Sequence, residues 1–164
     1  MAEGREIWII DSSSIIGVRE QVSRAHERKV FSALTSLTAG SQLLWPPEVT
    51  QEVEAALIAD SAVVWIKSRR ASGERSPKLE TVKSVLSKAP TLVDPDSTRE
   101  QADPYVVALA LEITSGDLFA PNVTIITEDR RDKPTKLSLA TAAGLLRIPT
   151  IPLRAFLNSQ SIHA

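Results

Sequence analysis

Four acidic residues occupy positions from which their carboxylates could converge on one metal ion. Asp11 ends an apolar run, Glu52 follows a double proline by about one helical turn, Asp103 precedes a proline, and Asp129 follows a second apolar run. Carboxylates packed together repel one another, and a divalent cation relieves that repulsion. Oxygen ligands favour Mg²⁺ or Mn²⁺, and such an ion activates water for attack on phosphorus. These residue types therefore favour metal-dependent hydrolysis of a phosphate ester, with water as the nucleophile.

Each acid also has a simpler interpretation. Asp11 and Asp103 could cap helices, since Asp is preferred at helix N-termini. Glu52 could belong to a solvated helix face, and Asp129 to a charged surface loop. Spacing favours Glu52 and Asp129, but neighbouring acids compete for both positions. The competitors are Glu48 and Glu54 for the second position and Glu128 for the fourth.

Composition limits the possible classes of protein. With 164 residues and 43% hydrophobic content, the chain is expected to form a single domain over residues 1–164. The sequence has no cysteine and only two histidines, which excludes thiolate sites and His-rich metal centres. No segment has the length of a membrane span or the pattern of a signal peptide, so we expect a soluble cytoplasmic protein that does not bind membranes. A net charge of −1 neither favours nor excludes nucleic acid as a partner.

Strand patterns alternate with helix patterns along the chain. Apolar runs predict strands at residues 7–10 and 123–127, with shorter strands at 42–45, 92–93 and 150–151. Helical patterns cover residues 12–22, 28–38, 48–59, 60–70, 78–88, 102–113 and 137–146, and a last helix starts near 153. Residues 71–77 are polar and predict a loop. Strands separated by helices indicate a three-layer α/β/α sandwich around a mainly parallel sheet. The carboxyl ends of parallel strands share one edge, where the four acids could meet.

Four motifs together resemble the PIN domain. They are Ile9-Ile-Asp11-Ser-Ser13, Pro47-Glu-Val-Thr-Gln-Glu52, Ala102-Asp103-Pro104-Tyr105 and Ile125-Ile-Thr127-Glu-Asp129. The order and spacing are most similar to the PIN-like branch called DUF4411, related to toxin ribonucleases of the VapC type, and the resemblance extends over residues 7–156. It implies a three-layer fold, Mg²⁺- or Mn²⁺-dependent endoribonuclease activity, a homodimer and inhibition by a cognate protein antitoxin.

The resemblance also implies roles for individual residues. Asp11, Glu52, Asp103 and Asp129 match the catalytic acidic quartet, and Asp11, Asp103 and Asp129 would bind the metal ion. Ser13 matches the small polar residue that supports the first acid. Thr127 and Glu128 belong to the motif around the fourth acid and are further supporting residues.

A ribonuclease must also bind the negatively charged RNA backbone, through positive side chains. Four basic residues follow the fourth acid and are the expected RNA contacts: Arg130, Arg131, Lys133 and Lys136. A second hypothesis is a PIN-like interaction or scaffold domain whose acidic pocket is vestigial. A haloacid dehalogenase-like phosphatase is disfavoured because Ser13 stands where its Asp-x-Asp motif needs the second Asp.

Overall fold

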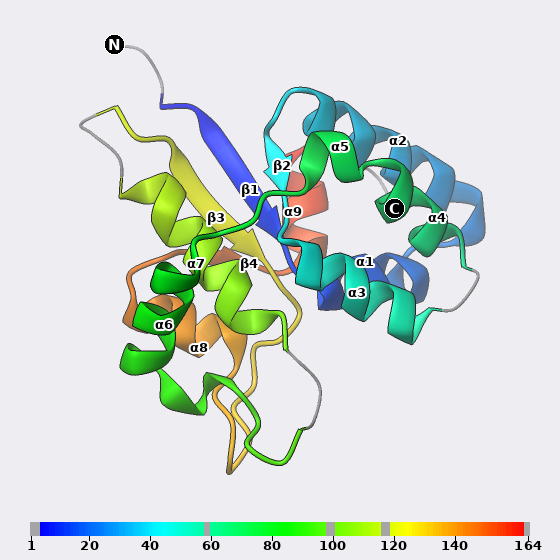
Figure 1. Cartoon of the computed structure of the whole chain (residues 1–164). Helices are drawn as coiled ribbons and strands as arrows, with labels where there is room; N and C mark the ends of the chain where they lie inside the picture. Colours follow the sequence, from blue (N-terminus) through cyan, green and yellow to red (C-terminus); the bar gives the residue numbers. More distant parts are fainter. Residues whose placement is uncertain (1–3, 58–59, 98–100, 116–118, 163–164) are drawn as a thin grey trace.

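The structure is a computed structural model that describes residues 4–57, 60–97, 101–115 and 119–162. Four parallel strands in the described residues form one sheet in the order β2-β1-β3-β4 (Figure 1). The strands are β1 (Glu6–Ile10), β2 (Leu43–Leu44), β3 (Asn122–Ile126) and β4 (Thr150–Ile151). The parallel sheet expected from the alternating strand and helix patterns is confirmed.

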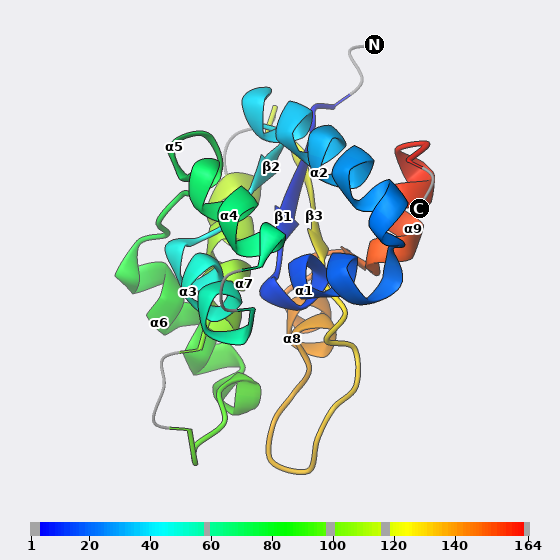
Figure 2. The same cartoon turned by 90° about the vertical axis from the view of Figure 1, so that its right-hand side faces the viewer.

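Helices cover both faces of this sheet. They are α1 (Ser12–Gln21), α2 (Arg24–Ala39), α3 (Pro47–Ala56), α4 (Ser61–Ser68), α5 (Arg70–Gly73), α6 (Leu79–Lys88), α7 (Asp103–Thr114), α8 (Leu139–Leu145) and α9 (Leu153–Ser159). Helix α7 lies against one face, while α1, α2 and α9 lie on the other (Figures 1 and 2). This is the predicted three-layer α/β/α arrangement.

The two central strands end in register at the edge where the acids were expected. Ile10 of β1 pairs with Ile126 of β3, so the residues that follow these strands are neighbours. The backbone N–H of Asp11 donates to the carbonyl of Ile126 at 3.0 Å, which extends the ladder by one residue. Asp11 and Thr127 are therefore placed side by side by the pairing of their strands.

The core is continuous from the sheet into the helices around it. Residues 106–110 of α7 are all buried, as expected for a helix that is apolar on every side. Trp45 and Trp65 are buried with ring centroids 5.6 Å apart, and Trp8 packs edge-on against Phe156 of α9 at 4.9 Å. The three tryptophans therefore serve packing, in agreement with their apolar sequence neighbours.

Several local predictions differ from the structure. The strand predicted at residues 92–93 is wrong, because the chain forms a 3₁₀ turn over Pro90–Leu92, where the proline favours a helical start. The loop predicted at 71–77 begins with the short helix α5. Helix α2 starts at Arg24 instead of residue 28, and residues 58–59, predicted to end a helix, lie outside the described residues. Among the described helices, none has both the length and the apolar character needed to cross a bilayer.

Candidate metal centre

Asp11 is buried at the carboxyl end of β1 and accepts several hydrogen bonds. It is the N-cap of α1, where its Oδ1 accepts from the backbone N–H of Ser12 at 2.8 Å. Its Oδ2 accepts from the hydroxyls of Ser13 at 2.8 Å and Thr127 at 3.0 Å. Asp11 can therefore cap α1 and also belong to the acidic site. The hydroxyls of Ser13 and Thr127 fix the orientation of its carboxylate.

Glu52 reaches the same place from α3. Pro47 is the first residue of this helix, a position where the missing N–H of proline costs no hydrogen bond. The helix therefore starts shortly after β2, the strand that neighbours β1. Glu52 lies in the second turn, where its Oε1 accepts from the hydroxyl of Ser12 at 2.8 Å. Ser12 therefore links the two acids, because its hydroxyl donates to Glu52 and its backbone N–H donates to Asp11.

Asp103 is the first residue of α7, whose N-terminus lies at the same edge of the sheet. The N-cap is Ala102, so the interpretation of Asp103 as an N-cap is wrong. Its Oδ2 instead accepts from the Nζ of Lys136 at 2.7 Å, with both side chains mostly buried. An ion pair in this position partly balances the negative charge of the site.

Three carboxylates meet at this edge. One oxygen from each of Asp11, Glu52 and Asp103 lies within 4.8 Å of the others, which is compatible with one shared cation. Burial, together with the charge of Glu52, raises the pKa of Asp11 to about 6, although its hydrogen bonds oppose the shift. Burial and the charge of Asp11 raise the pKa of Asp103 to about 7, and burial also raises the pKa of Glu52. Burial is the largest cause of all three shifts, and repulsion between the carboxylates adds to it although Lys136 opposes the shifts of Asp103 and Glu52.

Asp129 lies beside this group but is not one of the three. Its Oδ2 accepts from the backbone N–H of Leu139 at 2.9 Å and lies 3.6 Å from the Nζ of Lys136. The metal-ligand set expected from the resemblance included Asp129 and left out Glu52, whereas the close group contains Glu52. Asp129 is linked to the group through Lys136 and caps the start of α8.

The structure distinguishes the second and fourth acids from the neighbouring acids that compete for their positions. Glu52 belongs to the close group, and neither Glu48 nor Glu54 does, among the residues the structure describes. Glu128 points elsewhere: its Oε1 accepts from the backbone N–H of Leu153 at the start of α9, at 2.6 Å. Its Oε2 accepts from Gln21 at 2.9 Å. Glu128 thus joins α9 to α1, while Asp129 faces the acidic site.

Residues 8–164 match the model of a family described as a domain of unknown function, DUF4411. The chain belongs to this family. The match includes all four acids that were selected by position. No curated protein matches the sequence. Membership of DUF4411 bears out the branch expected from the motifs, and the link to PIN domains and VapC-type toxins stays a prediction.

The four basic residues expected to bind RNA do not act as one group in this DUF4411 member. Arg130 donates to the hydroxyl of Thr150 at 3.0 Å, on the side of β4. Lys136 lies inside the acidic site, where Asp103 and Asp129 outweigh the effect of burial and raise its pKa. Arg131 and Lys133 are exposed and line a small pocket of about 120 Å³ with Asp129. RNA contact by these residues stays a prediction.

Sequence reasoning missed two roles in the site. Ser12 stands in the first motif without a role of its own, yet its hydroxyl orients Glu52. Lys136 is predicted only as an RNA contact, yet its ammonium lies between Asp103 and Asp129. Only the position of Ser12 next to Asp11 could have suggested its role. No local pattern distinguishes Lys136 from the other basic residues in its loop.

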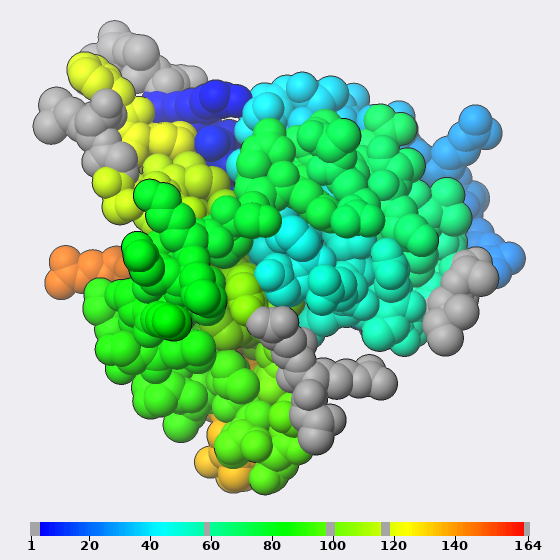
Figure 3. All heavy atoms as spheres, viewed as in Figure 1, coloured from blue at the N-terminus to red at the C-terminus, as the bar shows by residue number. Residues whose placement is uncertain are grey.

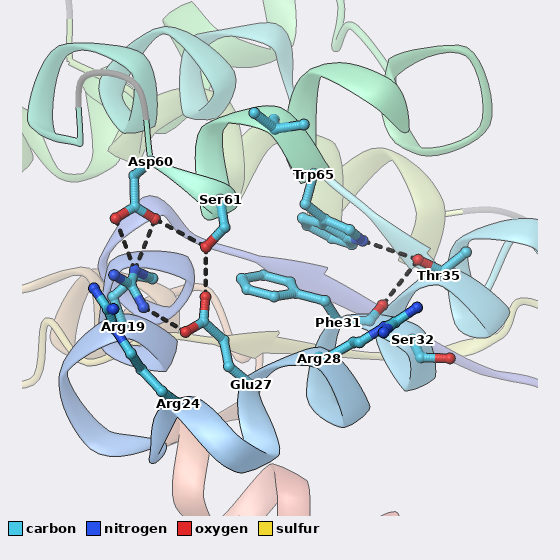
Figure 4. Close-up of a pocket in the computed structure, with 11 residues that line it drawn as sticks. Arg19, Arg24, Glu27, Arg28, Phe31, Ser32, Thr35, Asp60, Ser61 and Trp65 are labelled. Atoms are coloured by element: carbon cyan, nitrogen blue, oxygen red, sulfur yellow. Dashed lines mark hydrogen bonds and ion pairs between the residues drawn. The ribbon is translucent and has the colours of Figure 1, made fainter.

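A separate hollow of about 720 Å³ between α2 and α4 contains none of the predicted acids (Figure 4). Trp65 lines it together with three arginines, Arg19, Arg24 and Arg28, and the two acids Glu27 and Asp60. Glu27 accepts from Ser61 and forms an ion pair with Arg19, whose Nε lies 2.7 Å from Asp60. These contacts join α1, α2 and α4, and with three arginines against two acids the described lining offers no excess of negative charge for a cation.

Proposed function

We propose that this protein is an Mg²⁺- or Mn²⁺-dependent endoribonuclease that hydrolyses RNA phosphodiester bonds with water as the nucleophile. The observation that carries the proposal is the group of three buried or half-buried carboxylates, Asp11, Glu52 and Asp103, within 4.8 Å of one another. The oxygen-only donor set fits the preference of these hard cations, and a divalent ion would relieve the repulsion between carboxylates that adds to burial in raising the pKa values of Asp11 and Asp103.

The three carboxylates would hold the ion. When bound, it supplies a compact positive charge that acidifies water and stabilises the negative charge gained by a phosphodiester under attack. Ser13 and Thr127 hold Asp11 in one orientation, and Ser12 does the same for Glu52. Glu52 is the least buried of the three acids, so it is the group best placed to accept a proton from incoming water.

Lys136 would act on the opposite side of the acids. Its ammonium already binds Asp103 and lies near Asp129, next to the exposed side chains of Arg131 and Lys133. A phosphate that approaches from this loop would meet positive charge before it reaches the carboxylates. The RNA contacts proposed for this loop are therefore Arg131, Lys133 and Lys136, and Arg130 contributes from the rim.

A cleavage assay tests the proposal directly. End-labelled single-stranded RNA is incubated with the purified protein in Mg²⁺, Mn²⁺ or EDTA, beside Asp11→Asn, Asp103→Asn and the matched surface variant Glu20→Gln. We expect cleavage by the wild type and by Glu20→Gln with metal, and none in EDTA or with the two site variants. Cleavage that persists equally in EDTA and in both site variants would reject the site. Absence of cleavage with every metal would favour the interaction-domain hypothesis.

The wider biological role is a further proposal that rests on the resemblance to VapC-type toxins. The protein would be the toxin of a toxin–antitoxin pair, act in the cytoplasm, form a homodimer and be inhibited by a protein antitoxin. Expression of the wild type should arrest growth, and Asp11→Asn should not. Light scattering of the purified protein measures the oligomeric state, and a monomer at micromolar concentration would contradict the dimer.

A further inference from the structure

A groove opens directly beside the acidic site. It has a volume of about 570 Å³, in the range of small-molecule sites in proteins. Ser12 and Glu52 belong to both the groove and the acidic site, so the two are continuous. Residues of α1 and α3 line it together with Ser97 and Gln101 from the segment before α7, and the surface of α3 lies beside the α6–α7 region in the space-filling view (Figure 3).

The described lining of the groove is apolar or uncharged, apart from Glu52 at its inner end. Ile16, Ala55 and Ala56 present alkyl groups, and Gln51 presents an amide. No Arg or Lys belongs to the described lining, and the only charge is negative. A phosphate in the groove would be repelled by Glu52, whereas the apolar face of a neutral ring can lie on these alkyl groups, provided that its polar edge finds a hydrogen-bond partner.

Gln51 is the side chain in the groove that is available for recognition. It is exposed on α3, and no hydrogen bond joins its amide to another described residue. The amide of Gln101, in contrast, bonds to the backbone N–H and carbonyl of Asp94. A glutamine amide carries both donors and an acceptor, so it can pair with the edge of a nucleobase.

The opposite side of the acids has the complementary character. The pocket beside Asp129 is lined by Arg131, Lys133 and Lys136, and at about 120 Å³ it is much smaller than the groove. Its size and charge suit a phosphate group. The acidic site therefore adjoins both a basic, phosphate-sized pocket, through Lys136, and a larger groove, through Ser12 and Glu52.

We propose that the groove of Ile16, Gln51, Ala55 and Ala56 is a nucleobase subsite for the nucleotide next to the bond that is cut. This inference rests on the proposed function, because it names the substrate group that enters the same site. The base lies against the alkyl groups of α1 and α3, and the Gln51 amide bonds to its edge. A base held in the groove cannot pair with another strand, so the subsite selects single-stranded RNA.

Nucleotide binding tests the subsite without any need for cleavage. Amide NMR spectra of the full chain are recorded in EDTA with adenosine, cytidine, guanosine and uridine 5′-monophosphates, and with inorganic phosphate. We expect at least one nucleotide to shift the amide signals of residues 51, 55 and 56, while phosphate shifts only the loop at 131–136. Ala55→Phe, which fills the groove, should weaken nucleotide binding by about tenfold or more, the scale of one base contact.

Two further variants test whether nucleotide binding depends on the groove and on the Gln51 amide. Ala25→Phe places the same side chain on an exposed alanine of α2 outside the groove, and it should bind nucleotides as the wild type does. Gln51→Leu should change the order of affinity among the four nucleotides, because it removes the group that bonds to the base edge. The inference is overturned if nucleotides shift only the loop, or if Ala55→Phe binds them like the wild type.

The two proposals fail in different ways. RNA cleavage without nucleotide shifts in the groove would leave the endoribonuclease intact and reject the subsite. Nucleotide shifts in the groove without cleavage in any metal would reject the endoribonuclease and leave a nucleotide-binding groove.

Discussion

Hydroxyl groups determine how the first acid of the site is presented. Thr127 is fully buried, and its Oγ1 donates to Oδ2 of Asp11 at 3.0 Å while it accepts from the backbone N–H of Asp129 at 3.0 Å. One side chain thus fixes both the first acid and the segment that carries the fourth. Partners of this kind around metal ligands affect affinity although they do not touch the ion.

Thr127→Val keeps the shape of the side chain but removes its hydroxyl. We expect Mn²⁺ affinity to fall by about 10- to 100-fold, because Asp11 loses a donor that orients it. Isothermal titration calorimetry at pH 7.5 to 8 measures the change. Thr127→Ser retains a hydroxyl and should restore most of the affinity. Equal Mn²⁺ affinity of Thr127→Val and the wild type would contradict an orienting role.

Asp11→Asn should stabilise the metal-free protein at pH 8. The folded-state pKa of Asp11 is about 6 against a usual value of 3.8, so the folded protein holds this proton more tightly than the unfolded chain does. Its contribution to stability is therefore present at low pH and is lost as the pH rises through about 6. Removal of the charge should raise the free energy of unfolding by about 1 to 3 kcal/mol at pH 8.

Urea unfolding in EDTA, at pH 8 and near pH 4, measures this effect. The gain should shrink near pH 4, where the acid is largely protonated in the folded state and half protonated in the unfolded state. Glu20→Gln, on the exposed side of α1, is the control and should change stability little at either pH. A loss of stability at pH 8 in Asp11→Asn would show that the carboxylate is favourable in the folded state even without metal.

At the scale of elements, α5 shows how a segment without a strong helical pattern is held in place. Gly73 of α5 accepts from the backbone N–H of Trp45 at 3.0 Å, and the N–H of Arg75 donates to the Trp45 carbonyl at 2.9 Å. The Trp45 indole is fully buried and donates to Thr50 at 3.0 Å. Close backbone approach to a fixed ring requires a residue without a side chain at position 73.

Gly73→Ala should destabilise the protein. A Cβ at this position would lie 2.2 Å from the Trp45 ring, so the ring or the backbone must move. We expect a loss of about 1 to 3 kcal/mol in the free energy of unfolding, the usual cost of overpacking a core. Gly144→Ala is the matched control, because a Cβ at this exposed position of α8 meets nothing within 4 Å and alanine has a higher helix propensity than glycine. Thermal unfolding compares both, and equal melting temperatures would contradict the steric argument.

For the molecule as a whole, metal binding and folding stability should be coupled. The acids converge only when β1, α3 and α7 are in place, so an ion that binds them favours the folded state over the unfolded chain. Protons compete with the ion, because the pKa values of Asp11 and Asp103 are about 6 and about 7. The stabilisation by metal should therefore increase between pH 6 and pH 8.

Differential scanning fluorimetry with Mn²⁺ in excess tests this coupling. We expect a rise in the melting temperature that is larger at pH 8 than at pH 6, and a much smaller rise with Asp103→Asn. Ca²⁺ and Mg²⁺ run in parallel indicate the selectivity of the site. An equal rise in the wild type and in Asp103→Asn would place the stabilising ion elsewhere on the protein.

Patterns along the chain were sufficient to predict the layers of the fold and the edge that carries the acids. Apolar runs identify strands because buried strands exclude polar side chains, and parallel strands must place their carboxyl ends together. The pattern therefore predicts the position of Asp11 independently of the other acids. The short strands β2 and β4 were also predicted, whereas α5 was not, because its backbone bonds to the distant Trp45, and not its local sequence, hold it in place.

Tertiary structure decided which acids share the close group and which cation accompanies them. Spacing favoured Glu52 over Glu48 and Glu54, but only the direction of α3 relative to β1 brings Glu52 to Asp11 and Asp103. Glu128 and Asp129 are adjacent, yet one binds the start of α9 and the other the start of α8. Lys136 enters the acidic group because its loop folds back to the start of α7. No spacing along the chain predicts this contact.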